Sequence, residues 1–280
     1  MTTNFGLIII GDEILSGKRT DKHLPKAIEL LAARGLSLSY ADFVGDDPAR
    51  ITATLAGAFD AARNSGDVVF SCGGIGATPD DHTRHCAARA LGVALALHPE
   101  AKNLITERMQ DTAREQGIVF DPDRHDNIHR LNMGMFPVGA AIVPNPYNKI
   151  PGFTCVAGSG AVHFLPGFPV MAWPMMAWVL DTHYANLHQI AAYYEKSVIV
   201  MGSMEATLTP LMLDIESGHS GVKVFSLPSV DHPVYGRHIE LGVKGNPEAV
   251  GPAYAAMLAG LATFNVTLGP ELVRCLGALK

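Results

Sequence analysis

The most constraining stretch of this 280-residue chain is a short apolar run, residues 68–70, followed directly by a glycine-rich segment. Glycines let the backbone approach a ligand and leave N–H groups free for oxyanions, and a helix start after the loop adds partial positive charge. The pattern predicts a buried strand, a phosphate-binding loop and a helix, in that order. The segment reads Ser71-Cys72-Gly73-Gly74-Ile75-Gly76-Ala77-Thr78-Pro79-Asp80-Asp81-His82-Thr83.

Two adjacent carboxylates, Asp80 and Asp81, stand at the expected start of that helix. They would repel a phosphate unless a hard cation such as Mg²⁺ lay between them and the ligand. The segment therefore indicates a metal-assisted phosphate site. The alternative interpretation is a glycine-rich turn with acidic helix caps, which needs no ligand.

Strand and helix patterns alternate through the first part of the chain. Residues 5–10, 36–44 and 67–71 predict strands, and residues 21–34 and 49–63 have the apolar spacing of helices. This order predicts an α/β fold with a mainly parallel sheet wrapped by helices on both faces. Ligands of such sheets bind outside the carboxyl ends of the strands. We therefore expect the loops Gly11-Asp12-Glu13, Gly45-Asp46-Asp47 and 73–81 to meet at one edge.

The pattern changes after about residue 185. Residues 197–201, 204–215, 223–227, 237–243 and 247–264 read as strand, helix, strand, strand and helix. We predict two domains: residues 1–185 with the parallel sheet, and residues 186–280 as a smaller α+β unit. Residues 120–135 are polar and poorly periodic, which fits a helix or an ordered loop.

Charge and composition argue against several partners. The chain has 21 Lys and Arg against 27 Asp and Glu, a net charge of −6, and no basic block, so nucleic acid is not an expected partner. The longest apolar run, residues 171–180, is too short to span a bilayer. Four widely spaced cysteines and the lack of a basic, apolar leader predict a cytoplasmic protein.

Twelve histidines raise the question of a metal site. Among the closest pairs, His125 and His129 alone have i,i+4 helical spacing, and no glutamate accompanies them in an HExxH arrangement. We interpret the histidines as surface or packed residues.

Four ordered motifs together resemble the molybdopterin-binding (MoCF biosynthesis) domain, and more narrowly the amino-terminal part of the competence/damage-inducible protein A (CinA) family. The resemblance covers about the first 185 residues. The amidase domain that follows in full-length relatives has no counterpart in this sequence, so deamidase activity is not expected. The motifs are Gly11-Asp12-Glu13-Ile14-Leu15-Ser16-Gly17, Val44-Gly45-Asp46-Asp47, Gly73-Gly74-Ile75-Gly76-Ala77-Thr78-Pro79-Asp80-Asp81 and Leu165-Pro166-Gly167-Phe168-Pro169.

The resemblance implies a three-layer α/β sandwich whose pocket lies at these loops, and dimers or trimers of the chain. It also implies metal-assisted phosphoryl chemistry at Asp46 or Asp47 and at Asp81, either adenylylation of molybdopterin or hydrolysis of dinucleotide-like pyrophosphates such as ADP-ribose. Three departures stand out. Ala77 replaces a common proline, Lys22-His23 replace Thr-Asn, and Met171 replaces an acidic residue.

Our predicted site combines both lines of argument. Asp81 and an acidic partner among Asp12, Glu13, Asp46 and Asp47 would hold a divalent metal, with Asp81, Asp46 and Asp47 as catalytic residues. The phosphorylated ligand is a pterin or a dinucleotide. A non-catalytic binding module and a purely structural role for the acids remain open alternatives. The expected ligand-binding residues are Gly11, Ser16, Ser71, Gly73, Gly74, Gly76, Thr78, Asp80, Asn145, Pro166 and Gly167.

Overall fold

The computed structural model describes residues 3–188 and 193–276 and divides the chain into two compact units. The first unit comprises Met1–Leu31 and Ser37–Leu187, and the second comprises His188–Lys280 with the short segment Ala32–Leu36. Within the described ranges, no helix combines the length and the apolar character needed to cross a bilayer.

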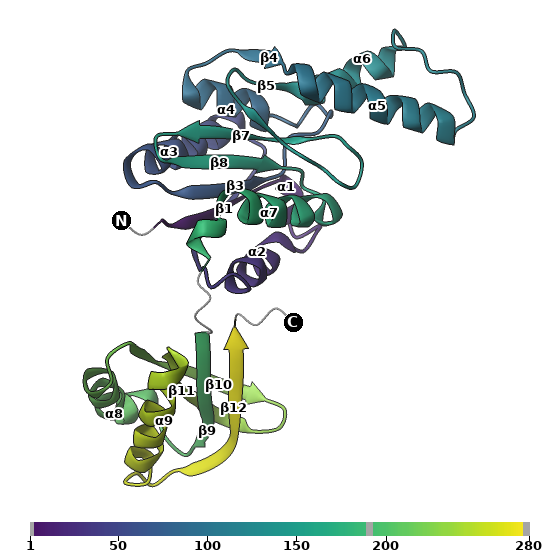
Figure 1. Cartoon of the computed structure of the whole chain (residues 1–280). Coiled ribbons are helices and arrows are strands. Elements are labelled where there is room, and N and C mark those ends of the chain that lie inside the picture. Colours follow the sequence, from purple (N-terminus) through teal and green to yellow (C-terminus); the bar gives the residue numbers. More distant parts are fainter. Residues whose placement is uncertain (1–2, 189–192, 277–280) are drawn as a thin grey trace. The chain divides into compact units, whose positions relative to one another are not determined.

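A six-stranded sheet in the order β2-β1-β3-β8-β7-β6 forms the centre of the first unit (Figure 1). The first four of these strands run parallel, and the last two are antiparallel to their neighbours. This confirms the predicted α/β fold with a mainly parallel sheet. The strands are β1 (Phe5–Ile10), β2 (Leu38–Val44), β3 (Val68–Cys72), β6 (Ala141–Val143), β7 (Gly152–Ala157) and β8 (Gly160–Leu165).

Helices cover both faces of this sheet, with α3 and α4 on one face and α2 and α7 on the other (Figure 1). The polar stretch 120–135 contains a short helix and a 3-10 turn, and the small sheet β4-β5 was not expected because each of its strands has three residues. The elements are α1 (Asp12–Leu15), α2 (His23–Ala32), α3 (Pro48–Ser65), α4 (Thr83–Leu91), β4 (Leu95–Leu97), α5 (Pro99–Glu115), α6 (His125–Leu131), η1 (Asn132–Gly134), β5 (Met135–Pro137), α7 (Pro169–His183) and η2 (Ala185–Leu187).

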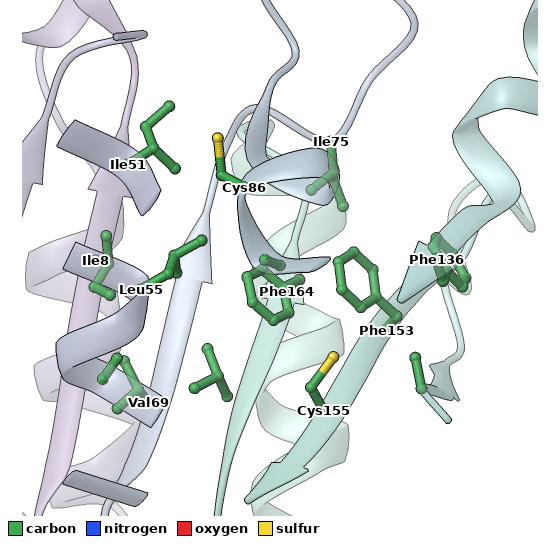
Figure 2. Packing of buried hydrophobic residues seen from close by; sticks show 14 of the residues in the cluster. Ile8, Ile51, Leu55, Val69, Ile75, Cys86, Phe136, Phe153, Cys155 and Phe164 are labelled. Atoms are coloured by element: carbon green, nitrogen blue, oxygen red, sulfur yellow. The ribbon is translucent and has the colours of Figure 1, made fainter. Parts of the chain in front are cut away.

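Burial follows from the position of each strand in the sheet. Every residue of β1, β3 and β8 is buried, as expected for central parallel strands covered on both faces. On the α3 and α4 face, Phe153 lies between Phe136 and Phe164, with ring centroids 4.6 and 4.4 Å apart (Figure 2). This core holds the carboxyl ends of the strands in a fixed arrangement.

The start of α3 is fixed by its sequence. Asp47 caps the helix by accepting a hydrogen bond from the Arg50 N–H at 2.8 Å, and Pro48 occupies the first turn, where its missing N–H costs nothing. The helix ends at Gly66, whose φ of +72° places it in the left-handed region. The acidic loop before α3 is therefore held at the carboxyl end of β2.

The second unit is an antiparallel sheet, in the order β10-β11-β9-β12, with α8 and α9 packed on one face. Strand β12 was not predicted, and it contains Gly269 and Pro270, two residue types that are unfavourable inside strands. The structure places them at a register shift in an edge strand, where a missing N–H is tolerated. The elements are β9 (Tyr193–Met201), α8 (Glu205–Gly218), β10 (Val222–His232), β11 (Gly236–Gly245), α9 (Pro247–Leu261) and β12 (Thr267–Leu276).

Candidate functional site

The glycine loop after β3 packs so closely that two of its positions exclude any side chain. Gly73 has φ +110°, and a Cβ there would lie 2.2 Å from the carbonyl oxygen of Ile10. Gly74 has φ +67°, and a Cβ there would lie 2.1 Å from Thr83 Oγ1. The Gly73 N–H donates to the Leu165 carbonyl oxygen at 3.0 Å, which ties the loop to the end of β8. Both glycines are therefore required by the loop path itself.

Asp81 stabilises this loop by hydrogen bonds to residues of the loop itself. Its carboxylate accepts hydrogen bonds from the Gly76 N–H at 2.8 Å, the Thr78 N–H at 2.7 Å and the Thr78 hydroxyl at 2.5 Å. Both carboxylate oxygens are thus engaged, and two N–H groups that we expected to bind phosphate donate to Asp81 instead. The metal role of Asp81 stays a prediction.

Arg84, which the sequence reasoning missed, lies beneath the loop. Its side chain is 3% exposed, and Nη1 donates to the carbonyl oxygens of Ile75 and, at 2.7 Å, of Gly76. Its Nε is buried without a partner among the described residues. Burial lowers the pKa of Arg84, and the nearby charge of Asp81 opposes this shift. The signal in the sequence was the spacing of Arg84 from Ala87 and Ala88, which are buried on the same helix.

Arg84 also determines which groups of the loop are left for a ligand. In a trans peptide the carbonyl of one residue and the N–H of the next point in opposite directions. Because the Gly76 carbonyl points to Arg84, the Ala77 N–H points away from it. Across residues 3–188 and 193–276, the N–H groups of Gly74, Ile75 and Ala77 donate to no acceptor. They are the loop groups best placed to receive an oxyanion.

The two other acidic loops, which contain Asp12 and Asp46, are joined by a pair of hydrogen bonds. The Asp12 N–H donates to Asp46 Oδ2 at 2.9 Å, and the Asp46 N–H donates to Asp12 Oδ1 at 3.1 Å. Each carboxylate keeps one oxygen outside this pair. The carboxylate of Glu13 lies over Gly11, where an added Cβ would be 2.6 Å from Glu13 Oε2. The sequence argument expected these loops at one edge, and the structure joins the first two directly.

A groove of about 1050 Å³ runs between the edge strand β2 and helix α3. Its mouth is lined by Asp12, Asp46, Asp47 and Asp80, so four of the predicted acids share one space. Asp81 and the loop residues 73–78 are not among the lining residues. The rest of the lining includes Tyr40, Asp42 and Phe43 of β2, and Arg50 with the small residues Ala53, Gly57 and Ala61 of α3.

Negative charge accumulates at the groove mouth. Burial raises the pKa of Asp46 above its usual 3.8, the hydrogen bond from the Asp12 N–H lowers it, and the charges of Asp12, Glu13 and Asp80 raise it further. A bound cation would relieve this repulsion. No group of three or more His, Cys, Asp or Glu in the described ranges is arranged to hold a metal ion. The donors present are hard carboxylate oxygens, which suit Mg²⁺ better than a softer metal.

Replacing Asp46 with asparagine should stabilise the protein slightly without a cation. Since the folded-state pKa of Asp46 is raised, its ionisation opposes folding once the pH exceeds the unfolded value of 3.8. Asparagine keeps an oxygen for the Asp12 N–H but carries no charge. We expect a rise in Tm of about 1–2 °C at pH 7, no difference below pH 3.8, and a smaller Mg²⁺-induced rise than in the parent. A lower Tm at pH 7 would contradict the repulsion.

The other predicted ligand residues lie apart from the groove lining. Ser16 is the exposed residue directly after α1, whereas Ser71 is fully buried and its hydroxyl has no partner among the described residues. Pro166 and Gly167 follow β8, and the Gly167 carbonyl lies 3.1 Å from His23 Nε2, so it accepts from that ring when Nε2 is protonated. These contacts give the 165–169 loop a structural role, and its ligand contacts stay a prediction.

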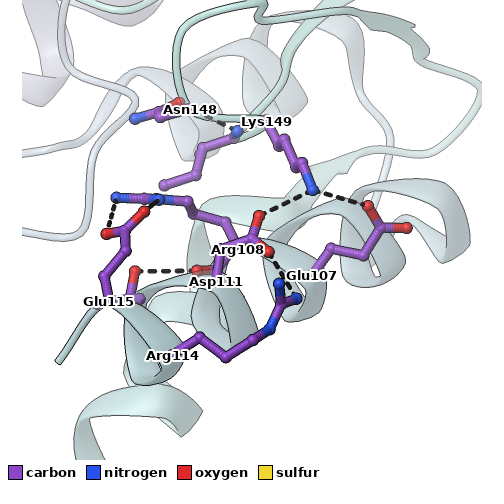
Figure 3. Close-up of polar contacts among 9 residues, drawn as sticks. Glu107, Arg108, Asp111, Arg114, Glu115, Asn148 and Lys149 are labelled. Carbon is purple, nitrogen blue, oxygen red and sulfur yellow. Dashed lines mark hydrogen bonds and ion pairs between the residues drawn. The ribbon is translucent and has the colours of Figure 1, made fainter. Parts of the chain in front are cut away.

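Asn145 organises a turn rather than an open surface. Its amide nitrogen donates to Asn148 Oδ1 at 2.8 Å and to the Ile150 carbonyl at 2.9 Å, and its oxygen accepts from the Tyr147 N–H at 3.0 Å. Lys149 ties this turn to α5 through Asp111, at 2.8 Å, in a surface ion network (Figure 3). With every polar atom engaged, Asn145 shapes the turn, and a ligand role for it is untested.

The fold is that of an α/β domain with a mainly parallel sheet, a class in which ligands commonly bind outside the carboxyl ends of the strands. The family model described as "Probable molybdopterin binding domain" matches residues 6–186, and the chain belongs to this family. The chain is 33% identical to a CinA-like protein of Anaeromyxobacter dehalogenans over 187 residues, which are 66% of this chain and 42% of that protein. It therefore matches less than half the length of that relative.

Two further comparisons extend the picture. A protein of Pyrobaculum calidifontis is 28% identical over 254 residues, covering 90% of this chain and 92% of that one. The crystal structure of CinA from Thermoplasma acidophilum, a protein with unknown function, is similar with a TM-score of 0.53 and 25% identity, covering 64% of this chain and 97% of that chain. The predicted resemblance to the amino-terminal part of the CinA family is thus confirmed.

Proposed function

We propose that the first unit binds a phosphorylated ligand with a flat ring, a pterin or a dinucleotide, and cleaves its phosphoanhydride with a divalent cation. The observation that carries this proposal is the groove at the carboxyl end of β2, whose lining combines five carboxylates with Tyr40 and the small residues of α3. Membership of a family described as molybdopterin-binding supports a pterin-like ring. A dinucleotide offers the same combination of ring and phosphates, and the experiment below separates the two.

The groove residues would have different roles in binding the cation and the ring. The free oxygens of Asp12 and Asp46 would take up the cation at the groove mouth. Because no three acids of the described residues are arranged around one point, water would complete its coordination. When bound, a divalent cation neutralises phosphate charge and polarises the phosphoanhydride. The ring would lie between Tyr40 and the small residues of α3. In this proposal Asp47 shapes the site by capping α3.

The phosphate would be held by the glycine loop. The N–H groups of Gly74, Ile75 and Ala77 are free in the described structure and would donate to its oxygens. Arg84 keeps two of the loop carbonyls turned away from the ligand and adds a buried positive charge beneath it. Such fixed donors stabilise charge as it develops on phosphate oxygens, because they need no reorganisation during the reaction.

The test is product release from ADP-ribose, FAD and NADH, and from ATP with molybdopterin, each with Mg²⁺, Mn²⁺ or Co²⁺. We expect turnover of at least one substrate and a loss of about 100-fold or more in Asp46→Asn, since a cation ligand is removed. The matched control is Asp60→Asn on the exposed surface of α3, which should keep full activity. Equal turnover in Asp46→Asn and the parent would remove Asp46 from the mechanism.

Asp46 is a sharper choice than Asp81 for this test. An asparagine at position 81 would place an N–H₂ group where the carboxylate now accepts from Gly76 and Thr78. Loss of activity in Asp81→Asn would therefore follow from a collapsed loop as well as from a lost ligand. Asparagine at position 46 keeps the acceptor for Asp12 and changes the charge alone.

A binding module without chemistry is the second candidate. It is favoured by the engagement of both Asp81 oxygens and by Met171, whose sulfur accepts from the Asn148 amide at 3.3 Å where an acidic residue was expected. On this reading the same panel gives ligand-induced thermal stabilisation and no product with any metal. The predicted dimer or trimer is checked separately by gel filtration with light scattering.

A further inference from the structure

Helix α6 carries a pair of imidazoles that the proposed function does not use. His125 and His129 are one helical turn apart, and both side chains are exposed. Their Nε2 atoms lie 3.2 Å apart, and the ring centroids are separated by 4.4 Å. The two ring nitrogens therefore lie next to each other, within hydrogen-bond distance, at the surface of the first unit.

The separation of these nitrogens matches a chelate. Metal–imidazole bonds are about 2.0–2.1 Å long, so two nitrogens 3.2 Å apart subtend about 100° at a shared metal. That angle lies between the octahedral and tetrahedral values. Neutral imidazole suits zinc, copper and nickel, whereas Mg²⁺ prefers oxygen.

We propose that His125 and His129 together bind one Zn²⁺, Ni²⁺ or Cu²⁺ ion per chain. No cluster of three candidate ligands occurs in the described part of the chain, so water completes the coordination at this exposed position. The neighbouring carboxylate of Asp126 is committed elsewhere, because it accepts hydrogen bonds from Arg124 at 2.5 and 2.7 Å and lies 3.6 Å from Arg130.

Metal binding would stabilise a helix that is only marginally stable by itself. Helix α6 has only seven residues, and its N-cap residue, Arg124, makes no side-chain capping bond. Helices this short are unstable without outside support. A chelate across positions 125 and 129 closes one full turn. The helix leads directly into η1, where the Gly134 carbonyl accepts from the His98 N–H at 2.9 Å at the start of α5.

Without metal, the same 3.2 Å separation allows one protonated ring nitrogen to donate to the other. Isothermal titration calorimetry of the full chain with Zn²⁺ or Ni²⁺ separates a chelate from a simple hydrogen bond. We expect saturation at one ion per chain, and a loss of at least about tenfold in affinity in His125→Gln or His129→Gln. His219→Gln, which removes a histidine from the second unit, should bind like the parent.

Hydrogen exchange gives a second readout. Peptides covering residues 125–131 should exchange more slowly with Zn²⁺ in the parent and in His219→Gln, but not in His129→Gln. Mg²⁺ at the same concentration should leave these peptides unchanged, which distinguishes this site from the carboxylates of the groove. Absence of saturable binding in the parent, or equal affinity in the histidine variants, would overturn the proposal. Neither readout depends on nucleotide turnover.

Discussion

Replacing Arg84 with methionine is expected to lower the free energy of unfolding of the first unit by about 2–4 kcal/mol. The carbonyl oxygens of Ile75 and Gly76 would lose their donor in a place that water reaches poorly. A buried carbonyl without a partner costs about 1–3 kcal/mol. Methionine keeps most of the aliphatic volume, so the loss reports the hydrogen bonds rather than a cavity.

Urea denaturation followed by tryptophan fluorescence measures this effect. Both tryptophans of the chain, Trp173 and Trp178, lie in α7, so their fluorescence reports the first unit. The control is Arg89→Met on the same helix, where the arginine is exposed. Its cost should stay below about 0.5 kcal/mol. Similar losses in both variants would mean that the loop contacts of Arg84 contribute nothing to stability.

The fold of the first unit was predictable where short apolar runs alternate with helical patterns, because each buried strand of a parallel sheet needs such a run. Apolar runs at 5–10 and 67–71 became β1 and β3, which are buried on both faces. Parallel strands place their carboxyl ends at one edge. This is why Asp12, Asp46 and Asp80, which are distant in the sequence, line one groove. The spacing of apolar residues was therefore sufficient to predict that these acidic loops lie together.

The partners of each acidic side chain were not predictable. Hydrogen-bond geometry depends on the path of a loop, and no local pattern reveals that Asp81 turns back to Gly76 and Thr78. Arg84 was missed for a related reason, since a charged residue is expected at the surface until its partners are known. The acceptors that make its burial tolerable are backbone carbonyls, which leave no mark in the sequence.

The two interpretations of the acidic residues, as structural caps and as ligands of a cation, are therefore compatible. Asp47 caps α3 and also lines the groove, and Asp46 latches a loop while its pKa is raised by neighbouring charge. A carboxylate has two oxygens and several lone pairs, so a structural hydrogen bond leaves room for a cation. Structural and functional roles must therefore be separated by variants that keep the acceptor and remove the charge.

The stability of the first unit should fall steeply in acid because of His163. This side chain is 1% exposed, and its ring lies 2.7 Å from Thr154 Oγ1 and 2.8 Å from the Tyr184 hydroxyl. Burial, with a smaller contribution from the charge of His183, lowers the pKa of His163 from 6.5 to about 3. Between these values the unfolded chain binds a proton that the folded chain does not, so stability is complete above pH 6.5 and is lost as the pH falls toward 3.

The part of the pH dependence of stability that is due to His163 can be isolated by comparison with His163→Gln. Glutamine cannot ionise but offers an amide to Thr154 and Tyr184. A single proton accounts for about 1.4 kcal/mol per pH unit. At pH 7 we expect the variant to be the less stable protein, because glutamine packs less well against Phe70, whose ring lies 5.3 Å from that of His163. By pH 4 the difference should shift in favour of the variant by on the order of 3 kcal/mol. Urea midpoints at pH 7, 6, 5 and 4 measure it, with His219→Gln as the control that keeps the parent slope. Parallel pH profiles for His163→Gln and the parent would show that His163 is protonated in the folded chain, and that its burial is no source of acid sensitivity.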